Sequence, residues 1–267
     1  MLWRDDEGGG HDKRAIGLAF GRAAETYDDH AALQRQVGQA LAALLPKTTL
    51  AAGGTLLDVG CGTGYMARQW RDGGAEVTAL DLSAAMLDQA RRRHSAEHYV
   101  QADAEYLPFA DGAFAACGSN LALQWCADLS VPLRELYRVL APQGQAVFST
   151  LMAGSLSQLR QAWAQVDGAQ HVNDFLPEAC LAQAMAAVGA DGVDHHTAVY
   201  TMWYPSVMAM MKDLKGIGAT HVHGGRRQGL LSRGHLAALA AAFLPWQNEQ
   251  GLLPLSYEVF YGVLRRD

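Results

Sequence analysis

Three glycines at alternating positions follow a short apolar run in LLDVGCGTGYM, residues 56–66. Glycine accepts positive φ angles and lets the backbone approach a ligand closely. The spacing therefore predicts a tight ligand-binding turn formed by Gly60, Gly62 and Gly64. Asp58 lies just before that turn, where a carboxylate would repel a pyrophosphate and attract an ammonium group. The G-x-G-x-G spacing fits neither the dinucleotide fingerprint nor the phosphate loop of nucleoside triphosphatases.

Two further carboxylates end the next two predicted strands. Asp81 closes EVTALD and can accept both hydroxyls of a ribose. Asp103 closes HYVQAD, where it can accept a hydrogen bond from an adenine amino group. The implied ligand has an amine, a ribose and an adenine but no phosphate. S-adenosylmethionine has these features, and its product after methyl transfer is S-adenosylhomocysteine.

Alternating strands and helices must position these groups. Apolar runs predict strands at 55–60, 76–81, 98–103, 114–120 and 145–151, with helices at 65–72, 84–93 and 131–140 between them. Such alternation is typical of a doubly wound, mostly parallel α/β sheet. Flanking it we expect helices over 15–45 that Pro46 ends, helices at 155–165, 177–188 and within 205–243, and strands at 193–203 and 255–266.

Composition restricts the class of protein. The chain has 267 residues, half of them hydrophobic, which suits one α/β domain with an insertion or two small domains. A net charge of −6 argues against a general nucleic-acid binder. The four cysteines show no C-x-x-C spacing, and no apolar run is long enough to span a membrane. We expect a cytoplasmic protein without a metal, a nucleic-acid partner or a membrane partner.

The glycine turn, the Asp81 strand end and QADAEYLPF (101–109) resemble class I S-adenosylmethionine-dependent methyltransferases. The resemblance implies a Rossmann-like seven-stranded sheet in the order 3-2-1-4-5-7-6, with the seventh strand antiparallel. It places Gly60 and Gly62 at the methionine end, Asp81 at the ribose, Asp103 and Ala104 at the adenine, and Asn120 and Leu121 beside the methyl group. Cys61, Leu82 and Met86, in or just after these motifs, join the predicted cofactor site. The alternative is a glycine turn kept for packing alone.

A narrower resemblance covers nearly the whole chain, from Lys13 to Arg265. KRAIGLAFGRAAETYDDHAALQRQ, SNLALQWCADLSVPLRELYRVL, TLMAGSLSQLRQAW and LKGIGATHVHGGR together resemble the malonyl-acyl-carrier-protein O-methyltransferase family of biotin synthesis. The resemblance implies methyl transfer to the free carboxylate of a malonyl thioester on acyl carrier protein, the methyl ester then priming pimeloyl synthesis. One departure is Thr63, which stands where the family pattern has proline.

The segment 19–36 has two interpretations. It is either an exposed helix face, or part of a lid that places Tyr27 over the methyl donor and a basic group, Arg35, near the donor's carboxylate. A carboxylate acceptor is already ionised at neutral pH and needs no strong general base. No His–Asp pair stands out in the sequence as an acid–base couple. We therefore predict a dry catalytic pocket lined by Tyr27, Asn120 and Trp125.

A basic cluster lies in the second helical block. Between 205 and 235 there are five lysines and arginines against one aspartate, which is either a solvated helix face or a surface for an acidic carrier. Lys215, His221, Arg226 and Arg227 are the candidate substrate and carrier residues. The glycines of LKGIGATHVHGGR are interpreted as bends in a lid over the cofactor cleft. His195 and His196 lack a nearby third ligand, so a metal site is not expected.

These patterns divide a single domain into a disordered tail (1–12), an N-terminal helical lid (13–46), a cofactor-binding core (47–151) and a part with the remaining strands and substrate insertions (152–267). We expect a monomer. Three rival functions share some of these features: a methyltransferase for a free small molecule such as a quinone, a non-enzymatic S-adenosylmethionine-binding regulator, and an NAD dehydrogenase. The glycine spacing argues against the dehydrogenase.

Overall fold

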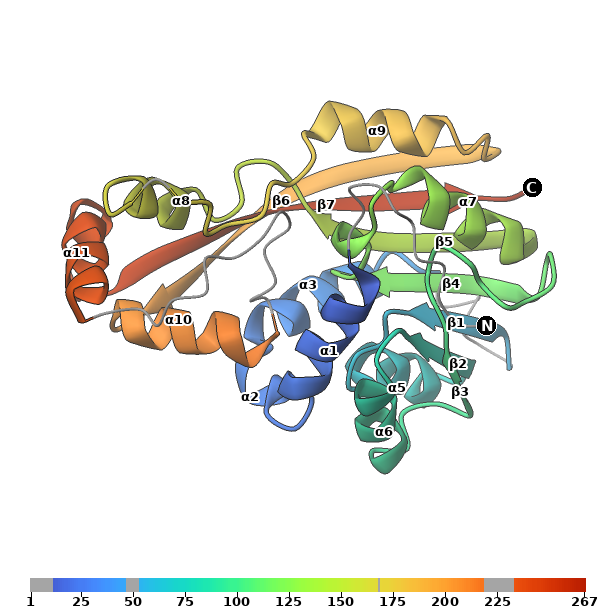
Figure 1. Ribbon diagram of the computed structural model, residues 1–267. Coiled ribbons are helices and arrows are strands. Elements are labelled where there is room, and N and C mark those ends of the chain that lie inside the picture. The colour runs from blue at the N-terminus through green and yellow to red at the C-terminus, as the bar shows by residue number, and fades with distance from the viewer. Residues whose placement is uncertain (1–11, 47–52, 168, 219–232) are drawn as a thin grey trace.

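A computed structural model describes residues 12–46, 53–167, 169–218 and 233–267, and these build one seven-stranded sheet (Figure 1). The strands are β1 (Thr55–Val59), β2 (Glu76–Asp81), β3 (His98–Gln101), β4 (Phe114–Asn120), β5 (Leu140–Leu151), β6 (Gly192–Tyr204) and β7 (Leu253–Arg265). Their order is β3-β2-β1-β4-β5-β7-β6, with β7 antiparallel to both neighbours. The predicted fold and strand order are confirmed.

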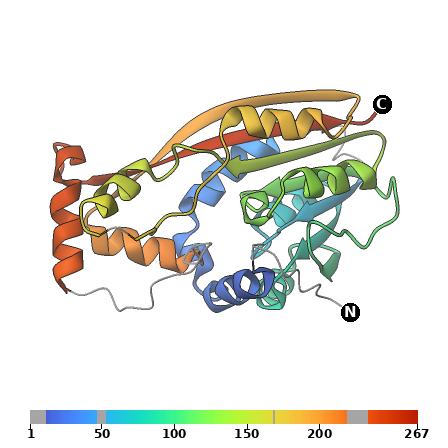
Figure 2. The ribbon, with the colours of Figure 1, turned by 45° about the horizontal axis from the view of Figure 1, so that its top comes forward.

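Helices cover both faces of the sheet (Figure 2). They are α1 (Lys13–Ala23), α2 (Tyr27–His30), α3 (Ala32–Ala42), α5 (Tyr65–Asp72), α6 (Ala84–Arg92), α7 (Ser130–Val139), α8 (Ser157–Ala164), α9 (Glu178–Ala186), α10 (Val207–Gly216) and α11 (Arg233–Phe243), with short 3-10 helices at Leu123–Trp125 and Leu244–Trp246. Within the described ranges, no helix is long and apolar enough to cross a membrane.

The central strand β1 is buried on both faces. Leu56 joins a core formed with α3, α5 and α6, whereas Leu57 and Val59 join a second core formed with α7 and α9. Alternation along a strand sends successive side chains to opposite faces, so a strand covered on both sides is apolar throughout. Asp58 is the exception, and it points to the same face as Leu56 because the two residues are two apart.

Some boundaries differ from the predicted ones. The helices expected over 15–45 are three, spanning 13–42, and α3 ends before Pro46. Asp12, predicted to belong to the tail, is the N-cap of α1, because its side chain accepts a hydrogen bond from the Ala15 N–H at 2.9 Å. Strand β3 ends at Gln101, so Asp103 lies in the following turn, where it accepts the Glu105 N–H at 3.0 Å.

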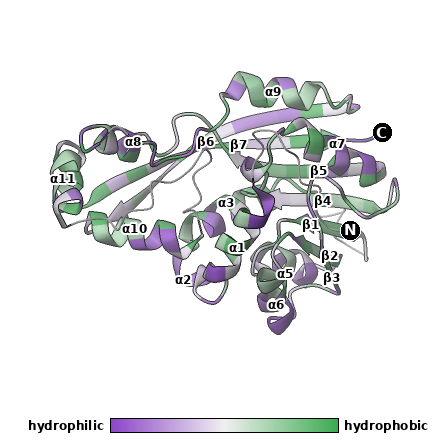
Figure 3. Cartoon of the chain, in the orientation of Figure 1, coloured by the Kyte–Doolittle hydropathy of each residue, from purple (hydrophilic) through white to green (hydrophobic). Residues whose placement is uncertain are grey.

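The long antiparallel strands β6 and β7 reach beyond the other strands, and a helical part lies at their far end (Figure 1). Helices α8, α10 and α11 lie there, and α11 is coloured almost entirely as hydrophobic (Figure 3). Leu239 and Phe243 of α11 are fully buried. This part of the fold corresponds to the region where the sequence predicts helical insertions, and α10 returns from it toward α2.

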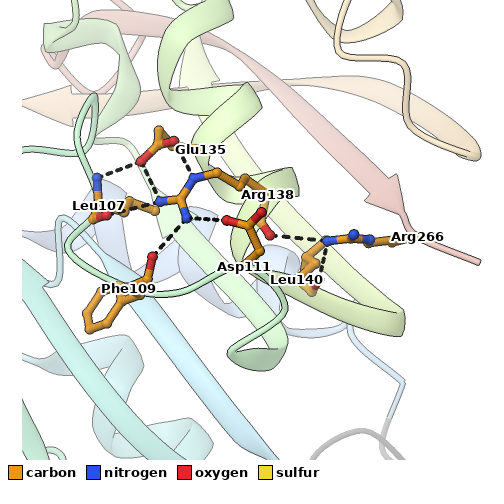
Figure 4. Close-up of polar contacts among 7 residues, drawn as sticks. All are labelled: Leu107, Phe109, Asp111, Glu135, Arg138, Leu140 and Arg266. Atoms are coloured by element: carbon orange, nitrogen blue, oxygen red, sulfur yellow. Dashed lines mark hydrogen bonds and ion pairs between the residues drawn. The ribbon is translucent and has the colours of Figure 1, made fainter.

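One arginine fixes the loop that carries the residues after β3 (Figure 4). Arg138 of α7 donates to the backbone carbonyls of Leu107 and Phe109 at 3.0 and 2.8 Å. Its guanidinium also binds Asp111 at 2.8 Å and Glu135 at 2.7 Å, and Glu135 accepts the Leu107 N–H at 2.7 Å. A planar guanidinium with five donors can hold several acceptors at once, which lysine cannot match. The loop bearing Asp103 is therefore anchored to α7.

Replacing Arg138 with leucine should loosen this loop. Because charge-assisted hydrogen bonds would be lost at a partly buried site, we expect a destabilisation of about 2 kcal/mol. For a chain of this size, that corresponds to a fall in melting temperature of about 4–8 °C. The matched control is Arg134→Leu, since Arg134 is exposed on the same helix. Equal melting temperatures for the two variants in a calorimetric scan would contradict the assignment.

Candidate functional site

The turn after β1 is shaped by glycines that no other residue can replace. Gly60 has a φ of +73°, and a Cβ there would lie 2.3 Å from the Ala122 side chain. Gly64 has a φ of +83°, and a Cβ there would lie 2.2 Å from the Ser95 hydroxyl. Positive φ and close contact both require glycine. The turn therefore packs against the segment after β4 while leading directly into α5.

Asp81 organises the neighbouring strand end. Its two oxygens accept the backbone N–H groups of Gly62 and Ser83, both at 2.8 Å. Burial raises the pKa of Asp81 to about 6, and these N–H groups oppose that rise. The carboxylate is thus mainly ionised at neutral pH, and each oxygen keeps a further lone pair for a ligand hydroxyl.

Asp58 is a buried carboxyl group at the end of β1. It is only 1% exposed, and the N–H of Ala67 in the first turn of α5 donates to it. Its Oδ2 atom is buried and has no hydrogen-bond partner in the described structure. Burial raises the pKa of Asp58 to about 8. A ligand ammonium at this position would satisfy Oδ2 and favour the ionised form, so the residues present fit S-adenosylmethionine.

Two adjoining cavities open at the carboxyl ends of the strands. The larger has a volume of about 720 Å³ and the smaller about 460 Å³, the space at their open mouths included. Both are lined by Tyr27, Gly60, Gly62 and Asn120. The other residues predicted for the cofactor or catalysis line one cavity or the other. The larger cavity is lined by Asp81, Leu82, Met86, Asp103, Ala104, Leu121 and Trp125. The smaller cavity is lined by Arg35, Asp58 and Cys61. Every one of these predicted residues therefore lines a single continuous region.

Both polar atoms of the Asn120 side-chain amide form hydrogen bonds. Its Nδ2 donates to the backbone carbonyl of Gln34 at 2.9 Å, and its Oδ1 accepts from the Ser149 hydroxyl at 2.8 Å. Leu121 has a φ of +49°, and its N–H reaches the Ser149 carbonyl at 3.1 Å. Asn120 thus joins the end of β4 to α3 and β5, and fixes how α3 lies over the smaller cavity.

Helix α1 supplies cavity residues that the sequence reasoning missed. They are Lys13, Ile16, Gly17 and Phe20. Their i, i+3, i+4, i+7 spacing is the signal of one helix face and was present in the sequence. Lys13 binds Asp103 and Glu105, both at 3.1 Å, and Phe20 packs edge-to-face on Trp125 with centroids 5.3 Å apart. Helix α1 is therefore fixed across the larger cavity at both ends.

Helix α2 is tied to the glycine turn through Asp28. The Thr63 hydroxyl donates to the Asp28 carboxylate at 2.6 Å, and Arg93 forms an ion pair with it. Arg35 donates to the Asp28 backbone carbonyl at 2.7 Å. Proline was expected at position 63, and proline has no hydroxyl to make this bond. Thr63 thus provides a tether between α2 and the turn.

A His–Asp pair that the sequence did not reveal joins α2 to α10. His30 contacts Asp213 at 2.7 Å, and the Tyr204 hydroxyl donates to the other Asp213 oxygen at 2.9 Å. A Cβ on Gly216 would lie 2.0 Å from the His30 ring, so the glycine permits this close approach. Neither His30 nor Asp213 is among the residues that line the two cavities.

Of the four predicted substrate and carrier residues, the structure describes one. Lys215 is exposed on α10 and is not among the residues that line the two cavities. His221, Arg226 and Arg227 lie outside the described residues. His195 and His196 stack on Phe260 and Tyr261 with centroids 5.0 and 4.7 Å apart, in line with a packing role.

Comparisons with known proteins identify relatives of this chain. Residues 57–148 match the family model described as a methyltransferase domain. A malonyl-acyl-carrier protein O-methyltransferase from Serratia marcescens is 52% identical, covering 96% of each chain. A protein of the same name from Salmonella typhimurium is 48% identical, covering 96% of this chain and 98% of that one. A putative methyltransferase from Bacillus halodurans shares the fold, with a TM-score of 0.58 at 17% identity over 87% of this chain and 98% of that one.

Cofactor binding should release a proton. At pH 7 the free protein holds Asp58 mainly protonated, since its pKa is about 8. A bound ammonium lowers that pKa, so we expect about one proton to leave on binding and the affinity to rise with pH up to about 8. Calorimetry of S-adenosylhomocysteine binding at pH 7, in two buffers of different ionisation enthalpy, measures the release. Asp58→Asn should abolish it, and a buffer-independent enthalpy for the wild type would refute the coupling.

Proposed function

Because the chain belongs to the malonyl-acyl-carrier protein O-methyltransferase family, we propose that it methylates the free carboxylate of a malonyl thioester carried by acyl carrier protein. The chain is an S-adenosylmethionine-dependent methyltransferase. One observation supports this acceptor over others. About half of the residues of this chain are identical to those of relatives with that name, over nearly their full length. We place the resulting methyl ester in biotin synthesis, as primer of pimeloyl formation.

The ionisation of the cavity residues favours an acceptor that is already charged. Among the described residues that line the cavities there is no histidine. Burial raises the pKa of Tyr27 above its ordinary value and that of Cys126 to about 12, so both side chains are neutral at pH 7. A phenol or a carbon acid would need a base to remove its proton, whereas a carboxylate brings its own charge. This supports a malonyl acceptor over a quinone-type metabolite.

Bound S-adenosylmethionine supplies a methyl group that its sulfonium makes electrophilic. We propose that Tyr27, Asn120 and Trp125 wall the pocket where the acceptor oxygen meets this methyl group. Their part is to orient the acceptor and to exclude water, since opposite charges that neutralise one another react faster in a dry site. Asn120 suits orientation because its amide is held by Gln34 and Ser149.

We also propose that the N-terminal helices of residues 13–46 form a lid over the cofactor. Four residues of α1 line the larger cavity, so the cofactor would exchange only when α1 moves. The bond between His30 and Asp213 links these helices to α10. We therefore propose that the helical insertion and the lid move together. Carrier binding near α10 would then change the position of the lid over the cofactor.

The acidic carrier would bind to basic side chains of the insertion. We propose Lys215, His221, Arg226 and Arg227 for this role, with arginine best suited to a carboxylate or phosphate because its guanidinium binds in a bidentate manner. The net charge of −6 and the four free cysteines fit a cytoplasmic monomer without nucleic-acid or membrane partners.

Methyl transfer to the carrier-bound acyl group tests the proposed function. The purified protein is incubated with S-adenosylmethionine and either malonyl-acyl carrier protein or free malonate, and intact masses are recorded. We expect a gain of one methyl group on the carrier only, and none with Asp81→Ala, which removes the ribose-binding carboxylate. Turnover of a free metabolite together with an unmodified carrier would exclude the proposal.

Charge reversal tests the carrier surface separately. The double variant Arg226→Glu and Arg227→Glu should weaken carrier binding by about tenfold or more, because like charges then face the acidic carrier. Cofactor affinity should stay within about twofold, since neither residue is predicted for the cofactor site. The matched control reverses two exposed arginines of described helices, Arg92 of α6 and Arg134 of α7. Equal losses of carrier and cofactor affinity in calorimetry would count against the surface.

A further inference from the structure

Two residues that line the smaller cavity each carry a buried side-chain oxygen without a hydrogen-bond partner among the residues that the structure describes. In the described part of the chain, five buried side-chain atoms lack a hydrogen-bond partner: Gln34 Oε1, Asp58 Oδ2, Trp70 Nε1, Ser95 Oγ and Trp163 Nε1. Gln34 and Asp58 both line the smaller cavity, whereas the other three line neither cavity. A buried polar atom left without a partner destabilises the structure that holds it. Two such atoms on residues that line one cavity indicate a ligand that bonds to both.

The two residues come from different elements that line the same cavity. Asp58 lies on β1, with its carboxyl group also held by the Ala67 N–H. Gln34 lies on α3, and its backbone carbonyl accepts from Asn120 at 2.9 Å. That bond fixes the position of the Gln34 backbone at the cavity wall. The cavity is therefore bordered by a strand residue and a helix residue that each carry an unpartnered side-chain oxygen.

The chemistry of this pair selects the ligand group. The Gln34 amide oxygen is an acceptor, and the Asp58 carboxyl group becomes a negative acceptor when a cation approaches and its proton leaves. A primary ammonium with several N–H donors therefore fits both atoms. Arg35, from the same helix as Gln34, lines the same cavity and offers a cation for a carboxylate. Together they complement the two charged ends of an α-amino acid.

We infer that Gln34 is a cofactor-specificity residue, whose side-chain carbonyl receives the ammonium of S-adenosylmethionine together with Asp58. The inference depends on the cofactor and not on the malonyl acceptor. A neutral amide suits the second position, because a second carboxylate beside Asp58 would raise the pKa of one of the pair. Gln34 thereby links recognition of the amino group to the placement of α3.

The test separates the ammonium from the rest of the cofactor. Gln34→Leu removes the acceptor at similar volume, and binding is measured by calorimetry with S-adenosylhomocysteine and with its analogue in which hydrogen replaces the amino group. We expect S-adenosylhomocysteine to bind about 10- to 100-fold more weakly to the variant, as for a hydrogen bond to a charged group. The deaminated analogue should bind wild type and variant within about twofold. The control is Gln36→Leu, since Gln36 is exposed on the same helix.

A second variant tests whether Gln34→Leu weakens binding only because it disturbs the structure of α3. Gln34→Glu keeps an acceptor oxygen at the same reach and should bind S-adenosylhomocysteine at least about tenfold more tightly than Gln34→Leu. Equal losses on both ligands, no loss on S-adenosylhomocysteine, or equally weak binding by Gln34→Glu would each overturn the inference. No carrier protein is present in these titrations, so their failure is distinguishable from failure of the proposed acceptor.

Discussion

The close packing of the turn after β1 is the constraint on which the site depends. Gly60 can lie against Ala122 only because it has no side chain, and the strand then leads straight into α5. This geometry leaves Asp58 buried at the border of the smaller cavity, where the Ala67 N–H of α5 donates to its carboxyl group and Oδ2 has no partner in the described structure. A carboxyl group so placed favours a cationic ligand because burial alone keeps it protonated. The charge of the cofactor therefore completes a site that the backbone has already shaped.

The N-terminal helices complete the other wall through polar contacts to this turn and to the strand ends. Asp28 binds Thr63 and Arg93, and Asn120 holds the backbone of α3. Such bonds are specific in direction, so they fix which face of each helix meets the cavity. Lys13 adds an ion pair to Asp103 near the predicted adenine position. Apolar packing alone would hold the helices on the sheet without fixing their rotation to this degree.

The stretch LKGIGA shows what tertiary contacts add to a sequence feature. Its glycines were interpreted as bends in a lid, which stays a prediction. Gly216 ends α10, where its missing side chain makes room for the His30 ring. Gly218, with a φ of +73°, follows the helix and packs against Phe20. These glycines are contact points between the insertion and the N-terminal helices, an arrangement that only the partner surfaces explain.

The sequence by itself determined the sheet, the strand order implied by family resemblance, and the set of polar residues at the strand ends. These follow from local periodicity and from the rule that parallel strands present their carboxyl ends at one edge. It did not determine that Gln34 and Lys13 belong to the site, or that His30 meets Asp213, 183 positions away. A helix offers every direction around its axis, and which residue faces the ligand depends on how the helix packs. Tertiary packing made that choice, since it alone brings distant side chains within hydrogen-bonding distance.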